Sequence, residues 1–159
     1  MVARKAGVIV NILGTAGERP TPSYLAGSMG NASLMAMTVA LGGESVGKGV
    51  RVVGVNPGLI ETERMMTMNK ARAVEKFGDE ARWREFLADM PLARAGAPEE
   101  VADLVAFLAS DRASWISGTI VTIDGGQWLK GAGQFNFLGR LTDQDWDELK
   151  PKKSNKKGA

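Results

Sequence analysis

Close to its first residue the chain carries a run of apolar, mostly β-branched residues, Val8–Leu13, with the sequence VIVNIL. Apolar and polar positions do not alternate along this run, which is typical of a strand covered on both faces in a parallel sheet. Two comparable runs follow at Val50–Val55 and Thr119–Ile123. The three runs are followed by GTAG, NPG and DGG, which favour turns. We therefore predict three buried strands.

Helical patterns separate these strands. A first helix is predicted from about Ser23 to Leu41, with Gly42 as its stop. Met65–Met90 indicates one or two helices broken near a glycine, and Pro98–Leu108 carries an apolar stripe at helical spacing. Strands that alternate with helices favour right-handed crossover connections. The predicted fold class is therefore α/β, with about three parallel strands and crossover helices.

The chain has 159 residues, the length of one ordinary domain. We predict a folded part over residues 1–138 and a polar, lysine-rich tail over residues 139–159 whose end is disordered. The formal net charge is +2, and five lysines fall within the last ten residues, so the folded part is close to neutral. We therefore expect no nucleic-acid partner; a contact of the tail with an anionic surface is the alternative to a solvated tail.

Two residue types are missing altogether, cysteine and histidine. Their absence excludes disulfides, thiolate catalysis, imidazole bases and metal sites built on either residue, and we predict no metal. Proton transfer must use Tyr24, a carboxylate, a lysine, a hydroxyl or water. The apolar stretch Gly7–Leu13 follows two basic residues, as in a signal peptide, but it is short and suits a strand better. We expect a cytoplasmic protein with no membrane partner.

Several segments together resemble the short-chain dehydrogenase/reductase family. They are Gly7–Ile12 (GVIVNI), Asn56–Thr62 (NPGLIET), Pro91–Ala102 (PLARAGAPEEVA), Phe107–Asp111 (FLASD) and Ser117–Gly118 before the strand that ends in DGG. Their order and spacing over roughly residues 7–126 carry the resemblance. It implies that residues 1–138 are the C-terminal half of a three-layer, Rossmann-like parallel sheet.

The resemblance also implies a function. Members of this family are NAD(P)-dependent oxidoreductases that move a hydride between nicotinamide and a carbonyl or alcohol. We therefore expect NAD or NADP as the cofactor, a small-molecule carbonyl or alcohol as substrate, and a homo-oligomer. The chain contains no Gly-x-x-x-Gly-x-Gly loop that follows a first strand and could place a pyrophosphate at a helix N-terminus, so we expect weak cofactor binding by this chain alone. The alternative is a non-catalytic binding or scaffold protein with the same fold.

The cofactor contacts are expected in the segment after the second strand. It lies at the carboxyl edge of the sheet, where ligands of open α/β sheets bind. Pro57 fixes a backbone angle, and Gly58 lets the backbone pass close to a flat ring. The backbone of Ile60 and the hydroxyl of Thr62 could then pair with the nicotinamide carboxamide. The alternative is an ordinary turn between a strand and a helix.

The catalytic positions depart from the family's pattern. The family has a serine at the end of the first of these strands, a tyrosine about thirteen residues later and a lysine four residues beyond. Counted back from the helix pattern, these positions fall on Gly14, Gly27 and Asn31. None of the three can transfer a proton.

A shifted alignment makes Tyr24 the general acid, with Thr15 as the nearby hydroxyl. Ser28 then stands where the lysine should be, so that no cation assists the phenol, unless Lys48 reaches in from elsewhere. The alternative is that Tyr24 packs at the start of the helix. Because the lysine is missing, we expect loss of the phenol to lower turnover less than the loss of a general acid usually does.

Methionines and tryptophans leave further alternatives open. Met65, Met66 and Met68 follow the Pro-Gly turn and could form a lid over an apolar ligand, or fill a helix interface. Trp83 and Trp115 are expected in the core or in an interface.

Overall fold

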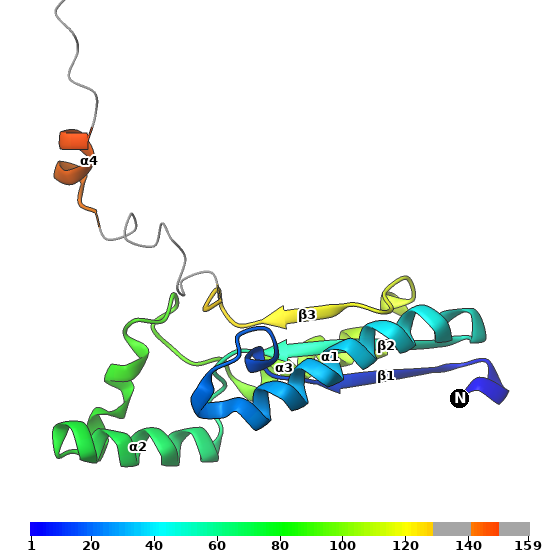
Figure 1. Ribbon diagram of the computed structural model, residues 1–159, viewed down its shortest axis with the longest axis horizontal. Coiled ribbons are helices and arrows are strands. Elements are labelled where there is room, and N and C mark those ends of the chain that lie inside the picture. Colours follow the sequence, from blue (N-terminus) through cyan, green and yellow to red (C-terminus); the bar gives the residue numbers. More distant parts are fainter. Residues whose placement is uncertain (129–140, 150–159) are drawn as a thin grey trace, which may run out of the picture. The chain divides into compact units, whose positions relative to one another are not determined.

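The computed structural model of the chain describes residues 1–128 and 141–149 (Figure 1). The chain divides into two compact units, Met1–Trp128 and Leu129–Ala159. The second unit contributes one described helix, α4 (Asp143–Leu149), within the predicted tail. The boundary predicted at residue 138 and the disorder predicted for the lysine-rich end lie outside the described residues.

Three parallel strands form the sheet of the first unit: β1 (Gly7–Ile12), β2 (Val50–Pro57) and β3 (Ile120–Ile123), in the order β1-β2-β3. Figure 1 shows all three arrowheads at the same end of the sheet, so the loops after the strands gather there. We call this end the carboxyl edge and the opposite end the amino edge.

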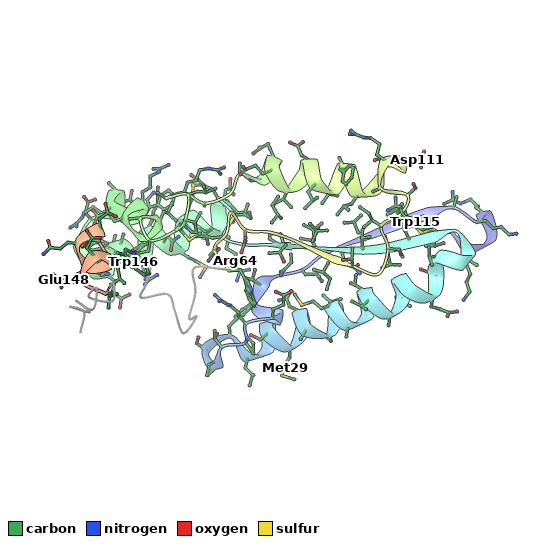
Figure 2. All side chains as sticks on the ribbon, turned by 90° about the horizontal axis from the view of Figure 1, so that it is seen from above. Met29, Arg64, Asp111, Trp115, Trp146 and Glu148 are labelled. Carbon is green, nitrogen blue, oxygen red and sulfur yellow. The ribbon has the colours of Figure 1, made fainter. Side chains whose placement is uncertain are left out.

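Helices cover both faces of this sheet. Figure 2 shows α1 (Leu25–Ser45) and α3 (Pro98–Ala109) on opposite sides of the strands. After β2 the chain leaves the sheet through α2 (Glu63–Phe77) and the 3₁₀ segment η5 (Glu80–Leu87). The shorter 3₁₀ turns are η1 (Val2–Arg4), η2 (Thr15–Gly17), η3 (Pro22–Tyr24), η4 (Val46–Lys48) and η6 (Asp111–Ala113). The predicted Rossmann-like, three-layer α/β fold is confirmed.

The core lies around the central strand. Val53 and Val55 of β2 are fully buried and pack with Leu108 of α3. β1 is different, because Ile9 and Ile12 are 38% and 53% exposed. The prediction that this first strand is covered on both faces is wrong for the described chain, since β1 is an edge strand here.

The first helix continues beyond its predicted stop. Gly42 lies inside α1, which ends at Ser45. A Cβ atom on Gly42 would overlap the backbone of Gly118 and come within 2.6 Å of the carbonyl oxygen of Val52. Gly42 therefore serves close packing of the helix on the sheet. On the outer side of α1, Met29 is 65% exposed and points away from the strands (Figure 2).

A buried cation supports the amino edge. Arg51 is 9% exposed, and its guanidinium donates to the carbonyl oxygens of Leu108 and Ser110 at 2.9 Å and of Ile116 at 3.2 Å. These carbonyls belong to the end of α3 and the turn after it, where a helix has unpaired acceptors. Arg51 thus ties the central strand to the end of that helix.

The two tryptophans behave differently. Trp83 is 3% exposed and belongs to the core between α2 and η5, as predicted. Trp115 is 99% exposed, so its placement in the core of this unit is wrong. Among the described helices, none is long and apolar enough to cross a membrane.

Candidate active site

The loop after β1 is held against the first helix. A Cβ atom on Gly17 would lie 2.8 Å from the sulfur of Met35 and 2.9 Å from the amide nitrogen of Ala32. The carbonyl oxygen of Thr15 accepts hydrogen bonds from the amides of Glu18 and Arg19 at 3.1 and 2.9 Å. The loop is therefore a fixed wall of the carboxyl edge.

The fold brings together two of the positions that the resemblance predicts to be catalytic. A Cβ atom on Gly14 would lie 3.3 Å from both amide atoms of Asn31. The Asn31 Nδ2 atom donates to the carbonyl oxygen of Gly27 at 2.8 Å, one turn earlier in α1. Gly14, Gly27 and Asn31 therefore lie in one region; that they are the family's catalytic positions stays a prediction.

Tyr24 covers Gly27, the remaining one of the three predicted positions. A Cβ atom on Gly27 would overlap the Tyr24 ring and lie 2.6 Å from its hydroxyl oxygen. The phenol therefore fills the space into which a side chain at position 27 would leave α1. It is 54% exposed, so solvent reaches it.

Lys48 does not lie beside this phenol. Its Nζ atom forms an ion pair with Glu44 at 2.8 Å, at the far end of α1 from Tyr24. That helix has 21 residues, and a helix of this length spans about 30 Å. The possibility that Lys48 assists Tyr24 is therefore excluded by the fold.

The Pro-Gly segment packs against the end of β3. The Gly58 amide donates to the carbonyl oxygen of Ile123 at 3.0 Å, and the Leu59 amide to Oε1 of Gln127 at 3.0 Å. A Cβ atom on Gly58 would lie 2.6 Å from that of Asp124. Gly58 is thus required by packing within the chain; its contact with a cofactor, like that of Pro57, stays a prediction.

Two hydrogen-bonding groups follow on this segment. The residues on either side of Ile60 form backbone hydrogen bonds with Gly96. The Glu61 amide donates to the Gly96 carbonyl oxygen at 2.8 Å, and the Gly96 amide donates to the Leu59 carbonyl oxygen at 2.9 Å. The amide of Ile60 has no acceptor among the described residues. The Thr62 hydroxyl accepts from the amide of Met65 at 3.2 Å as the N-cap of α2, and it keeps its own proton to donate. Both groups suit a primary amide such as a carboxamide.

Two buried polar atoms at this edge lack a partner within the described chain: Ser28 Oγ and Asn56 Oδ1. Ser28 is 2% exposed and lies in the first turn of α1, and Asn56 is fully buried directly before Pro57. Burying an unpaired polar group costs about 1–3 kcal/mol, so such atoms point to a bound ligand or water. Both atoms belong to segments that reach the carboxyl edge.

A small pocket of about 60 Å³ lies beside the Pro-Gly segment. Its lining includes Leu59, Ile60, Met90–Leu92, Arg94, Gly96, Glu100 and Ile123–Gly125. Arg94 and Glu100 pair through two contacts of 2.8 Å, and the Ala97 amide donates to the same carboxylate at 2.7 Å. The Arg94 guanidinium, then the Ala97 amide, lowers the pKa of Glu100 to about 2. This pairing fixes one wall of the pocket to the start of α3.

The methionines after the Pro-Gly turn divide into two groups. Met65 is buried in the core with Trp83, and Met66 packs against that core. Met68 is 61% exposed. The helix-interface interpretation therefore describes the first two, and a lid remains a prediction for the third alone. Within residues 1–128 and 141–149, no group of three acidic side chains could hold a metal ion.

Comparison with known proteins identifies the fold's family. A family model described as enoyl-(acyl carrier protein) reductase matches residues 1–127, most of the chain. The chain belongs to the short-chain dehydrogenase/reductase family. The family resemblance inferred from the motifs is thus confirmed.

Individual members of the short-chain dehydrogenase/reductase family give the extent of the match. A 3-oxoacyl-[acyl-carrier-protein] reductase of Thermotoga maritima is 37% identical over 79% of this chain and 47% of its own length. Galactitol 2-dehydrogenase (L-tagatose-forming) of Cereibacter sphaeroides is 40% identical over the same shares. The crystal structure of actinorhodin polyketide ketoreductase with NADPH superposes with a TM-score of 0.72 and 28% identity, over 80% of this chain and 49% of that one. The chain spans about half the length of the curated relatives it matches.

Some residues of this edge escaped the sequence analysis. The orphaned atoms of Ser28 and Asn56 gave no signal, because burial without a partner is not written in a local pattern. The contact between Arg19 and Trp128 joins loops that are far apart in the sequence. The proximity of Gly14 and Asn31, by contrast, follows from the family's spacing.

Proposed function

We propose that this chain forms the hydride-transfer half of a NAD(P)-dependent oxidoreductase that acts on a small carbonyl or alcohol compound. The observation that carries the proposal is the segment Asn56–Thr62 at the end of the central strand, with the unpaired amide of Ile60 and the orphaned Asn56 Oδ1 beside it. Family membership and the reductase and dehydrogenase names of the relatives support it. So does the similar ketoreductase, whose crystal structure is of the protein with NADPH.

The residues of the Pro-Gly segment would hold and orient the nicotinamide. A bound nicotinamide cofactor would supply or accept the hydride. The Ile60 amide would donate to the carboxamide oxygen, and the Thr62 hydroxyl would offer a second hydrogen bond. Pro57 and Gly58 keep this segment packed on the end of β3, which fixes the two donors relative to the sheet.

Tyr24 is the proposed proton donor, and the hydroxyl of Thr15, in the loop after β1, is the proposed second catalytic group. In the reducing direction the substrate's carbonyl carbon receives the hydride, and its oxygen receives the phenolic proton. The exposed phenolate then regains a proton from water. In the shifted alignment, which makes Tyr24 the acid, Ser28 stands at the lysine position and supplies no positive charge. Proton transfer should therefore be weakly assisted.

A second candidate function is a non-catalytic binding or scaffold protein. It is favoured by the alignment counted from the helix pattern, in which Gly14, Gly27 and Asn31 fall on the family's three catalytic positions. To separate the two, we would fuse this chain behind the remaining half of the Thermotoga maritima reductase, giving what we call the joined protein. Saturable NADH or NADPH fluorescence with oxidation of the cofactor by a panel of aldehydes and ketones supports the enzyme. Binding without turnover supports the scaffold.

The chain by itself should bind NADH and NADPH weakly, with no saturation into the high-micromolar range. A tight, saturable titration of the chain alone would show that one of its own segments cradles the phosphates. We also propose self-association, because the edge of β1 and the outer face of α1 leave apolar side chains exposed. Sedimentation should show species larger than a monomer; a compact monomer with a sharp melt would contradict this.

A further inference from the structure

Arg19 and Trp128 form a contact between two loops of the carboxyl edge. The Arg19 guanidinium carbon lies 4.1 Å from the centroid of the Trp128 ring. In the part of the chain that the structure describes, this guanidinium forms no ion pair and donates no hydrogen bond. Glu18 precedes it in the sequence but does not pair with it. Arg19 therefore offers its donors to a group from outside.

The strand order places this contact across the end of the central strand. Arg19 belongs to the loop after β1 and Trp128 to the turn after β3, and β2 lies between these strands. Figure 1 shows the blue loop and the yellow turn at the same end of the sheet. Their contact thus bridges the end of β2, where the segment Asn56–Thr62 begins.

Both partners are anchored through their backbones. The Arg19 amide donates to Thr15 O at 2.9 Å, and the Trp128 amide donates to Asp124 Oδ2 at 2.6 Å. Asp124 in turn packs against Gly58. The cation is therefore positioned between the proposed proton-transfer loop and the proposed nicotinamide segment.

The chemistry of this group selects a ligand class. A guanidinium that stacks on an indole keeps the edge of its planar fork available. This fork matches two oxygens of a carboxylate or a phosphate. We infer that Arg19, held on Trp128, binds an anionic oxygen group of the substrate, which is then a carbonyl or alcohol compound carrying a carboxylate or phosphate. This inference rests on the proposed function for the identity of the ligand as a substrate.

A second arginine supplies a matched control. Arg112 lies over the Phe107 ring at 5.8 Å, at the amino edge of the sheet. Arg112, like Arg19, stacks on an aromatic ring, but it lies at the opposite edge of the sheet. Cation–π contacts alone are frequent in this chain, since Arg72 also lies over Phe86 at 4.4 Å. What sets Arg19 apart is its place at the carboxyl edge.

The test uses this chain and no nicotinamide. We would titrate its tryptophan fluorescence with acetoacetate, with dihydroxyacetone phosphate and with neutral ethyl acetoacetate at constant ionic strength. Subtracting the fluorescence of the Trp128→Phe variant from that of the wild type gives the contribution of the Trp128 indole. We expect a saturable change with one or both anions and none with the ester. Preference for one anion tells a carboxylate from a phosphate substrate.

Variants then locate the binding. Arg19→Gln should weaken the anion's affinity by at least about tenfold, because it removes the charge and the fork. The anion's affinity for Arg19→Lys should lie between those of the wild type and Arg19→Gln. Arg112→Gln should bind the anion as tightly as the wild type does. Equal binding of the ester, unchanged affinity in Arg19→Gln, or no saturable signal with either anion would overturn the inference.

This outcome is separable from that of the proposed function. Anion binding through Arg19, together with a joined protein that never oxidises NADH or NADPH, leaves the anion site standing and removes the oxidoreductase. Turnover of neutral and anionic carbonyls with equal KM, unaffected by Arg19→Gln, leaves the oxidoreductase and removes the anion site.

Discussion

Two arginines, Arg51 at the amino edge of the sheet and Arg19 at the carboxyl edge, are held in opposite ways. At the amino edge, Arg51 is buried and three backbone carbonyls accept its hydrogen bonds. At the carboxyl edge, Arg19 is stacked on a ring and has no polar partner in the described chain. The same side chain thus completes the structure at one edge and is available to a ligand at the other.

The orphaned polar atoms follow the same division. Ser28 Oγ and Asn56 Oδ1 belong to the segments that frame the carboxyl edge. Unmet hydrogen-bonding capacity lowers stability by about 1–3 kcal/mol for each buried group, so these two segments carry a cost that the described residues of the amino edge do not. The difference suggests a division that can be tested: Arg51 stabilises the fold at the amino edge, and the proposed binding groups lie at the carboxyl edge. Substitutions at the two edges should therefore differ in what they change.

The largest expected effect is on folding, at the amino edge. Arg51→Met keeps the aliphatic stem and leaves three carbonyls without a donor, so the free energy of unfolding should fall by about 3 kcal/mol. Urea unfolding followed by circular dichroism, at one protein concentration, measures it. Exposed Arg112→Gln is the control and should change little. A loss below about 1 kcal/mol for Arg51→Met would break the contrast between the edges.

The next effect is on turnover, at the carboxyl edge. In the joined protein, Tyr24→Phe should lower kcat by about tenfold, below the range of about 10²–10⁴ typical of general acids, because no cation assists the phenol. The free energy of unfolding should stay the same, since the ring is half exposed. A thousandfold loss of kcat would show a fully effective acid and would require a cation that the described residues do not place there.

A smaller change of stability should accompany Gly27→Ala. The added methyl group displaces the Tyr24 ring, while alanine suits a helix interior better than glycine. We expect the free energy of unfolding to change by less than about 1 kcal/mol, and kcat to fall to the value of Tyr24→Phe. Gly30→Ala is the matched control, because nothing lies within 4 Å of its added Cβ. An unchanged kcat in Gly27→Ala would show that the position of the Tyr24 ring over Gly27 does not matter for turnover.

The smallest effect concerns acid stability. The pKa of Glu100 is lowered from 4.5 to about 2, first by Arg94. A lowered carboxyl pKa stabilises the fold above the unfolded-state value, and this contribution is lost as the pH falls toward 2. Glu100→Gln should therefore lower Tm at neutral pH, and the difference should shrink below pH 4.5. Thermal melts across this range measure it, with Glu99→Gln as the control; a Tm difference independent of pH would contradict it.

The sequence predicted more of the fold than of the site. Apolar runs without alternation located all three strands, and Pro98 located the start of α3. The same reasoning missed the course of α1 through Gly42, because the glycine is there for contact with a distant strand. It misjudged the coverage of β1, and of its two alternatives for Trp115 the core is wrong while the interface stays a prediction, because burial depends on which elements lie beside a segment.

At the site, the family's spacing led to Gly14, Gly27 and Asn31, and the structure brings these positions into one region. The placement of the Tyr24 ring over Gly27 could not be read from spacing, since Tyr24 lies in the turn before α1. The bridge from Arg19 to Trp128 could not be read either, because it depends on strand order.

The backbone contact between Gly42 and Gly118 has a mechanical consequence for Tyr24. It pins α1 near its last turn, while the phenol lies at the opposite end of the helix. With a rise of about 1.5 Å per residue, the helix is about 27 Å long between Gly42 and Tyr24. A tilt of the helix by about 5° at Gly42 would therefore move the phenol by about 2 Å. The contact of Gly17 with Ala32 braces the helix along its length. A bulky side chain at Gly42 would therefore displace Tyr24, the proposed proton donor, at the other end of the helix without touching it.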